Sequence, residues 1–247
     1  MPALLELRSL SKRFGQVVIA DDLSLTVREG ETVGIVGPNG AGKTTLFGLI
    51  SGDLEVDSGS VLLDGLDLAG AGAAQRCRRG IGRTYQVPRP FEGLTVFENV
   101  LVAAQQGGGL GRQDSYRRAL ETLERARLGG SANRLAGSLG LLERKRLELA
   151  RALATRPRLL LLDEVAGGLT DPEVTELVDI VRGAREEGMA VIWIEHVVRA
   201  LLATVERLIC LAAGHLVADG VPGEVIEDPR VRELYLGADT AVGAIPE

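Results

Sequence analysis

A short glycine-rich segment near the N-terminus constrains the fold of this chain more than any other feature. It consists of Gly37, Pro38, Asn39, Gly40, Ala41, Gly42, Lys43, Thr44 and Thr45. An apolar run over 32–36 precedes it, and a helix-like run over 45–50 follows. Glycines at this point let successive backbone N–H groups converge, and a helix N-terminus adds a dipole that favours an anion. The order strand, glycine loop and helix predicts a phosphate-binding loop in an α/β fold.

Two side chains at the end of this segment fit the chemistry of a bound triphosphate. Lys43 is placed to reach the β- and γ-phosphates, and the Thr44 hydroxyl to hold Mg²⁺. A plain glycine turn is the alternative, but only Lys12, Lys43 and Lys145 are lysines among the 28 basic residues. The position of one of them here favours a site for a nucleoside triphosphate with Mg²⁺.

Composition narrows the class of protein. A hydrophobic fraction of 45% in 247 residues supports a sizeable core, and an aromatic fraction of 3% makes that core aliphatic. The net charge of −6 disfavours nucleic acid as a partner, because phosphate backbones require a positive surface. Cys77 and Cys210 lack the spacing of metal ligands and are typical of reduced thiols in a cytosolic protein.

The sequence shows no pattern of a signal peptide or of a membrane span. Glu6 and Arg8 already interrupt the first ten residues, and the uncharged apolar stretches are far shorter than the ~20 residues that a bilayer requires. We therefore expect no direct membrane insertion, and any membrane role through a partner.

Periodic patterns divide the chain into three parts. The first third is predicted to be rich in strands, with the clearest alternation over 23–27. Helical spacing appears in the middle, over 116–126 and 142–154. Glycine- and alanine-rich stretches at 69–74 and 107–111 predict flexible connections.

The last third returns to alternating strands and helices, with buried strands predicted over 158–164 and 190–194. This order predicts a single α/β domain over 1–247 with a parallel sheet, and a mostly helical insertion over 88–157. On the helix predicted at 142–154, the charged residues expected to lie largely outside are Glu143, Arg144 and Lys145.

Two carboxylates mark a second candidate region. Asp163 and Glu164 end an all-leucine strand, at the strand end where α/β sheets place their ligand chemistry. Asp163 is predicted to hold the metal through water, and Glu164, on the opposite side of the strand, to act as a general base. A strand that simply meets solvent is the alternative, and the phosphate-binding loop weighs against it.

Two further polar residues are candidates for the same site. His196 follows the next buried strand, where a neutral imidazole can contact the γ-phosphate and position water. Gln86 can ligate Mg²⁺ through its amide oxygen, although its position alone makes it one polar loop residue among many. His215 is interpreted as a turn residue without a role.

The order of these motifs resembles that of the ATP-binding cassette (ABC) ATPases. The segment 37–45 resembles the Walker A loop and Leu159 to Glu164 the Walker B strand. Gln86 stands at the position of the Q-loop glutamine and His196 at that of the switch histidine. Phe14 stands at the position of the aromatic residue that stacks on adenine.

This resemblance implies a P-loop NTPase core with an antiparallel β subdomain and an inserted helical subdomain. It also implies an enzyme that hydrolyses ATP with Mg²⁺ and pairs head to tail with a second cassette. Permease subunits would then hold the chain at the cytoplasmic face of the inner (plasma) membrane.

Within the family, the chain is most similar to the nucleotide-binding subunits of branched-chain amino-acid importers. The similarity is carried by residues 83–86, 90–100, 144–151 and 235–237. Importers of amides, urea or polar amino acids share these features, so the solute stays open.

The family signature, Leu-Ser-Gly-Gly-Gln, is degenerate in this chain. The residues at its position are Leu139, Gly140, Leu141, Leu142 and Glu143. The family's serine and glycines contact the γ-phosphate held by the opposite subunit, so the two leucines are expected to obstruct this approach and Glu143 to add charge near an anion. Thr170 likewise stands at the D-loop position, where the family usually has Asp or Asn.

Three functions follow from these observations. The leading one is an ATPase subunit of a membrane importer, paired with a second cassette that supplies an intact signature; a homodimer would have two weakened sites. A soluble regulatory or scaffold cassette with little turnover is favoured by the degenerate signature and opposed by Glu164 and His196. A DNA-repair or translation cassette is disfavoured by the acidic charge.

Overall fold

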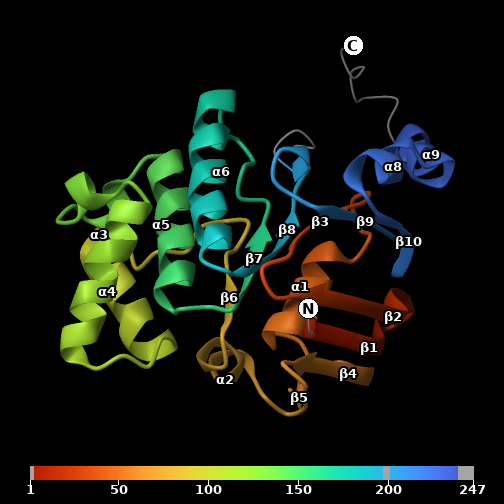
Figure 1. Ribbon diagram of the computed structural model, residues 1–247, viewed down its shortest axis with the longest axis horizontal. Helices are drawn as coiled ribbons and strands as arrows, with labels where there is room; N and C mark the ends of the chain where they lie inside the picture. The colour runs from red at the N-terminus through yellow and green to blue at the C-terminus, as the bar shows by residue number, and fades with distance from the viewer. Residues whose placement is uncertain (1–2, 197–200, 239–247) are drawn as a thin grey trace.

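The chain forms two sheets with helices around them (Figure 1). The computed structural model describes residues 3–196 and 201–238. The first sheet is antiparallel with the order β2-β1-β4-β5. Its strands are β1 (Ala3–Phe14), β2 (Val17–Arg28), β4 (Ser58–Leu63) and β5 (Leu66–Asp67). Alternate residues of β2, namely Leu23, Leu25 and Val27, are buried, as the period-two pattern predicts.

The second sheet has the order β10-β9-β3-β8-β7-β6. Its strands are β3 (Thr32–Val36), β6 (Ile81–Arg83), β7 (Leu159–Asp163), β8 (Ala190–Ile194), β9 (Arg207–Ala212) and β10 (His215–Gly220). Only β10 pairs antiparallel, with β9, among the described strands of this sheet. The leucines of β7 are fully buried because the strand is covered on both faces.

Two hydrophobic clusters fill the two faces of this sheet. Leu159 and Leu161 belong to the cluster shared with the first sheet and with α1 (Lys43–Ser51), which lies between the sheets. Leu160 and Leu162 belong to the opposite cluster, with α6 (Asp171–Glu186). The shorter helices around the sheets are α2 (Ala73–Arg78), α8 (Pro222–Glu227) and α9 (Pro229–Ala238).

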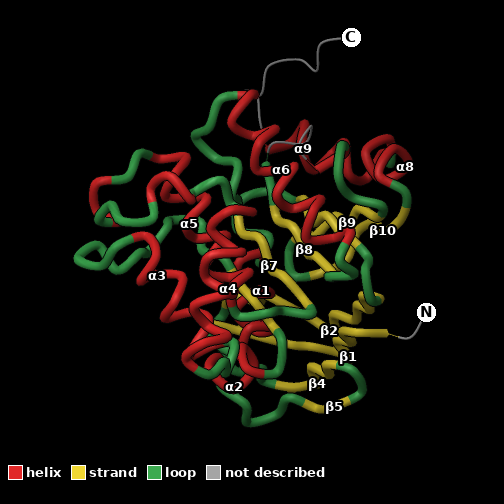
Figure 2. Tube along the Cα trace, turned by 60° about the vertical axis from the view of Figure 1, so that its left-hand side comes forward, coloured by secondary structure: helices red, strands yellow, loops and turns green. Residues whose placement is uncertain are grey.

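The chain between β6 and β7 is helical and has its own hydrophobic cluster. It contains α3 (Val96–Val102), a π-helical segment (Ala103–Gly107), α4 (Arg112–Arg125), two 3₁₀ turns (Gly129–Ser131 and Ala136–Ser138) and α5 (Leu141–Ala154). Figures 1 and 2 show α3 and α4 grouped beside α5, away from the antiparallel sheet. Helix α5 connects the two regions, because Leu149 lies in the cluster of the sheet and Leu147 in that of the insertion.

One expectation from the sequence is wrong. Lys145 was expected largely outside but is buried, since α5 is covered on more than one side. The stretches predicted as connections, 69–74 and 107–111, lie outside helices and strands at 69–72 and 108–111, while α2 begins at Ala73 and the π-helical segment ends at Gly107.

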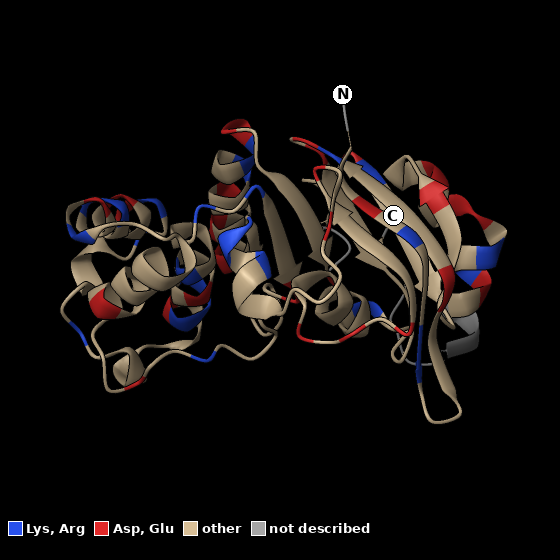
Figure 3. Ribbon diagram, turned by 90° about the horizontal axis from the view of Figure 1, so that it is seen from below, with Lys and Arg blue, Asp and Glu red and all other residues tan. Residues whose placement is uncertain are grey.

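The exterior carries both signs of charge. The positions of acidic and basic residues are interspersed along the helices and strands of the ribbon in Figure 3. No helix within the described residues combines the length and apolar character that crossing a bilayer requires.

Candidate functional site

The phosphate-binding loop joins β3 to α1 and needs its glycines for steric reasons. Gly40 and Gly42 have φ values of 80° and 95°, in the left-handed region that glycine adopts without strain. A Cβ on Gly37 would lie 2.0 Å from the carbonyl oxygen of Leu211, and one on Gly42 would lie 2.6 Å from that of Ile19. Because α1 has neither a side-chain cap nor an acidic residue in its first turn, its N-terminus is suited to an anion.

Lys43 is buried at the start of α1. Its Nζ donates to the carbonyl oxygens of Gly37 at 2.7 Å and Pro38 at 3.0 Å. Burial lowers the pKa of Lys43, while the carboxylates of Glu164 and Asp163 act in the opposite direction. The lysine therefore lies inside the loop, with both carboxylates near enough to act on it.

Asp163 and Thr44 meet across the loop. The Thr44 Oγ1 lies 3.5 Å from Asp163 Oδ1, a long contact, and Asp163 is buried at the end of β7. On its other side, Asp163 Oδ2 accepts from Arg83 Nη2 at 3.3 Å. Burial raises the pKa of Asp163, and the Arg83 guanidinium opposes that shift. Arg83 was missed in the sequence because one arginine at a strand end carries no distinguishing pattern.

Three side chains converge one residue further on. Gln86 Nε2 donates to Glu164 Oε2 at 2.6 Å, and His196 Nε2 lies 2.8 Å from Glu164 Oε1. Glu164 has a φ of 49°, which is uncommon for a residue with a side chain. The structure thus brings together the three residues that the sequence predicted separately.

The oxygen donors here fit Mg²⁺. Mg²⁺ is usually held by one or two carboxylates together with substrate phosphates, and Thr44 and Asp163 offer a hydroxyl and a carboxylate beside the loop. Since the Gln86 amide nitrogen faces Glu164, its oxygen is the amide atom left for a metal. No cage of three or more His, Cys, Asp or Glu residues occurs in the described part of the chain.

The predicted adenine-stacking residue lies at the end of β1. Phe14 is 48% exposed, so about half of its surface is accessible to a partner. Lys12 Nζ lies 5.3 Å from the ring centroid.

The degenerate signature forms the start of α5. Gly140 is the N-cap without a side-chain cap, Leu139 is buried, and Leu141 is 48% exposed. Leu142 packs against the cluster of the second sheet, so of the two leucines only Leu141 faces outward. Glu143 accepts from Ser131 at 2.7 Å and Arg134 at 2.8 Å, so its charge is compensated within the insertion.

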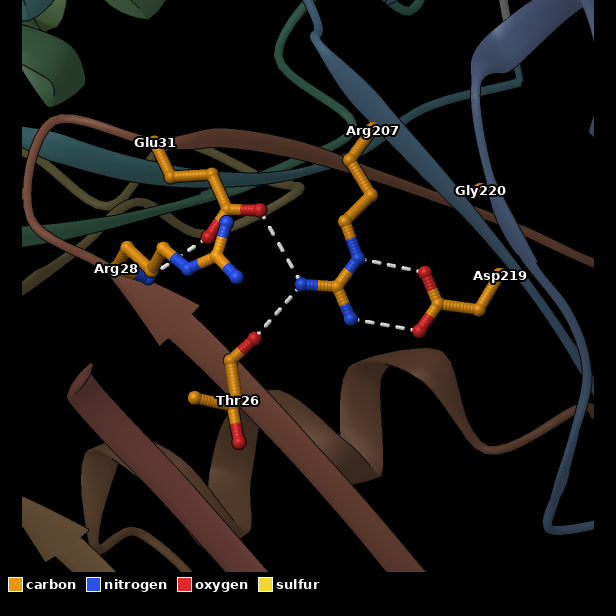
Figure 4. A pocket seen from close by; sticks show the side chains of 6 residues that line it. All are labelled: Thr26, Arg28, Glu31, Arg207, Asp219 and Gly220. Atoms are coloured by element: carbon orange, nitrogen blue, oxygen red, sulfur yellow. Dashed lines mark hydrogen bonds and ion pairs between the residues drawn. The ribbon is translucent and has the colours of Figure 1, made fainter. Parts of the chain in front are cut away.

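A pocket of about 420 Å³ elsewhere in the molecule is structural (Figure 4). Arg207 donates through two nitrogens to Asp219, both at 2.6 Å, and through a third to Glu31 at 3.2 Å and to the carbonyl oxygen of Thr26 at 2.9 Å. These bonds raise the pKa of Arg207. They join β2, β9 and β10 and pair the charges of Arg207, Asp219 and Glu31 with one another.

Comparison with known proteins identifies the class. The family model "ABC transporter" matches residues 20–167, and "Branched-chain amino acid ATP-binding cassette transporter" matches residues 215–241. The chain belongs to the ABC transporter family of ATPases, as the order of its motifs predicted.

Curated relatives cover nearly the whole chain. The ATP-binding protein of the lipopolysaccharide export system of Escherichia coli K12 is 37% identical over 96% of this chain and 98% of its own. A high-affinity branched-chain amino acid transport ATP-binding protein of Pseudomonas aeruginosa, BraF, is 35% identical over 95% of this chain and 98% of its own. The export relative and the amino-acid transport relative therefore have similar sequence identity to this chain.

Solved structures share the fold. The ADP conformation of MJ1267, an ATP-binding cassette of an ABC transporter, has a TM-score of 0.86 and 29% identity, and covers 96% of this chain and 100% of its own. A nucleotide-free ATP-binding cassette has a TM-score of 0.86 and 28% identity, over 98% of this chain and 100% of its own. Both the fold class and the recognition of the family from the sequence are confirmed.

Proposed function

We propose that this chain powers an importer of branched-chain or related amino acids or amides. The match of a branched-chain amino-acid family to residues 215–241 and the relative BraF support this solute class. Export is the second candidate, because the lipopolysaccharide-export relative is 37% identical. Permease subunits would hold the chain at the cytoplasmic face of the inner membrane and convert closure of a cassette pair into transport.

The convergence of Gln86 and His196 on Glu164 carries the proposed chemistry. Glu164 would take a proton from the attacking water, and His196 would hold that carboxylate and the water in place. Lys43 and the loop N–H groups would bind the phosphates, and Phe14 would stack on adenine. Thr44, Asp163 and Gln86 would hold Mg²⁺, whose charge stabilises the developing negative charge on the phosphates.

A second, different cassette fits the signature segment best. In a head-to-tail pair, the exposed Leu141 would face the triphosphate held by the partner and keep the backbone from approaching it. The site built on this chain's Lys43 would instead receive the partner's signature. One site of a heterodimer would then be complete, whereas a homodimer would have two obstructed sites.

The helical segment 88–157 would act as a subdomain that moves against the sheet. Its own hydrophobic cluster supports this role, since a segment with a separate core can shift as a unit. Helix α5 would carry the motion toward the nucleotide site.

Steady-state ATP hydrolysis of the purified chain, compared with Glu164→Gln, tests the proposal. Turnover that the substitution abolishes while ATP binding remains would establish Glu164 as the base. Binding without turnover in the unchanged chain would assign the defect to the signature, and a candidate partner cassette should then restore turnover. If the Glu164→Gln chain hydrolyses ATP as fast as the unchanged one, the assignment of the base is wrong. Transport of labelled leucine into vesicles with the permease tests the solute.

A further inference from the structure

Lys145 is buried beneath the turn that carries Glu164. Its residue exposure is 5%, and its Nζ donates to the Glu164 carbonyl oxygen at 3.1 Å. Burial lowers the pKa of Lys145, while Glu195 and Glu164 oppose this shift. Lysine is almost never buried without a polar partner, and the Glu164 carbonyl oxygen is such a partner for Lys145.

The turn after β7 is held by side chains from several elements. Glu164 has a φ of 49°, a conformation that persists only where its surroundings fix it. The Glu195 Oε1 accepts from the backbone N–H of Ala166 at 2.5 Å, and Lys145 holds the Glu164 carbonyl. The Glu164 side chain is left to Gln86 and His196. Lys145 and Glu195 therefore fix the backbone from which the carboxylate projects.

Lys145 also connects the turn to the signature segment. Helix α5 begins at Leu141, so Lys145 lies on the same short stretch of helix as the residues that would face a partner's triphosphate. A shift of the start of α5 would move the ammonium group that holds Glu164. Two of the three lysines, Lys43 and Lys145, are buried at this site in a chain that otherwise uses arginine.

We propose that Lys145 is a positioning residue that ties the Glu164 turn to helix α5. Movement of the signature segment, which would face the partner's triphosphate, would then adjust the Glu164 carboxylate in this chain's own nucleotide site. This inference rests on Glu164 being the general base. The residue would not touch ATP. Its effect would come from holding the carboxylate within the small range of positions that proton transfer allows.

The experiment compares Lys145→Met, which keeps length and removes the donor, with Lys145→Arg, which restores a cation. Arg112→Met, an exposed cation at the start of α4, is the matched control. Each variant is assayed for kcat and KM of ATP hydrolysis, with the partner cassette if turnover requires it. We expect kcat of Lys145→Met to fall about tenfold or more, KM to stay within about twofold, and Lys145→Arg to recover most of the loss.

Hydrogen exchange of the isolated chain supplies a readout that does not depend on turnover. Amides of residues 164–169 should exchange about tenfold faster in Lys145→Met, while those of β8 and α4 stay unchanged. Unchanged exchange and unchanged kcat would overturn the proposal, as would parallel losses of kcat and ATP affinity. If Lys145→Met does not fold, Lys145→Gln takes its place under the same criteria. A Glu164→Gln chain that keeps turnover would refute the general base instead, whatever the Lys145 variants do.

Discussion

Glu164 and His196 follow the neighbouring parallel strands β7 and β8, and the His196 Nε2 is 2.8 Å from Glu164 Oε1. Asp163 of β7 pairs in register with Ile194 of β8, so the residues that follow the two strands leave the same edge of the sheet. The histidine can therefore hold the carboxylate without any loop rearrangement. Because His196 contacts Glu164 and the loop binds the phosphates, the effect of His196 on hydrolysis can be measured separately from its effect on ATP binding.

Replacement of His196 by alanine should lower kcat about 10- to 100-fold while ATP binding stays within about twofold. The reason is that the imidazole contacts Glu164, whereas the phosphates are bound by the loop. Single-turnover hydrolysis and equilibrium ATP binding separate the two effects. Alanine in place of the exposed His215 serves as the control, and equal loss of binding and turnover in His196→Ala would contradict the assignment.

Partial restoration of the signature should raise ATP turnover by the chain alone. In Gly140→Ser/Leu141→Gly, a serine returns to the N-cap and the outward leucine is removed, so the backbone can approach a phosphate. Gly140→Ser alone should change stability by only a few tenths of a kcal/mol. Leu120→Ala removes another exposed leucine and is the control. No gain in turnover at saturating ATP would mean that Leu141 is not the obstruction.

Alanine at position 37 should abolish ATP binding and cost about 2–4 kcal/mol of unfolding free energy. Its Cβ would lie 2.0 Å from the Leu211 carbonyl oxygen, so β9 or the loop must shift. Urea unfolding and a fluorescent ATP analogue measure the two losses. Gly223→Ala, where a Cβ meets nothing within 4 Å, should leave both unchanged.

Arg76 should be a strong contributor to stability. Its guanidinium donates to the carbonyl oxygens of Leu49 at 2.7 Å, Ile50 at 3.1 Å, Leu68 at 3.1 Å and Ala71 at 2.8 Å, which joins the end of α1 to the segment before α2. Arg76→Met leaves these acceptors unpaired and should cost about 3 kcal/mol in urea unfolding. The exposed Arg78→Met in the same helix should cost less than about 0.5 kcal/mol.

The capping box of α6 predicts a pH dependence. The Glu173 carboxylate accepts from the N–H and the Oγ1 of Thr170, both at 2.8 Å, and these bonds hold the pKa of Glu173 below its ordinary value of 4.5. A lowered folded-state pKa means stability that is present above pH 4.5 and lost as the pH falls through the folded pKa. The free energy of unfolding of Glu173→Gln, measured across pH 3–7, should therefore lie below that of the unchanged chain at neutral pH and converge with it at acid pH. In a Thr170→Ala background the difference between Glu and Gln at position 173 should become smaller, because the Oγ1 bond is lost while the backbone N–H bond remains.

The sequence predicted the parts of the site that rest on local patterns. The loop over 37–45 and the strand predicted at 158–164, found at Leu159–Asp163, are recognisable because glycine spacing and an all-leucine run depend on neighbours in the chain. Gln86 required the family resemblance, because its position alone makes it one polar loop residue among many. His196 was already a candidate from its place after the next buried strand.

The sequence could not predict contacts set by packing. Lys145 lies on a helix covered by two hydrophobic clusters, so no single apolar stripe indicates which residues face inward. Arg83 reaches Asp163 from β6, on the strand next to β7, and this pairing becomes visible only once the strand order is known. The different exposure of Leu141 and Leu142 likewise follows from packing, because Leu142 lies against the cluster of the second sheet and Leu141 does not.

The carbonyl of Leu211 over Gly37 bears on how such chains evolve. Strand β9 runs beside β3, so the glycine would be retained by packing even in a descendant that no longer hydrolyses ATP. The first glycine of the loop therefore indicates descent from this fold, and it does not indicate that the chain still hydrolyses ATP. Loss of activity would leave its trace elsewhere, at positions such as the outward-facing Leu141, where the interior of the chain does not dictate the residue.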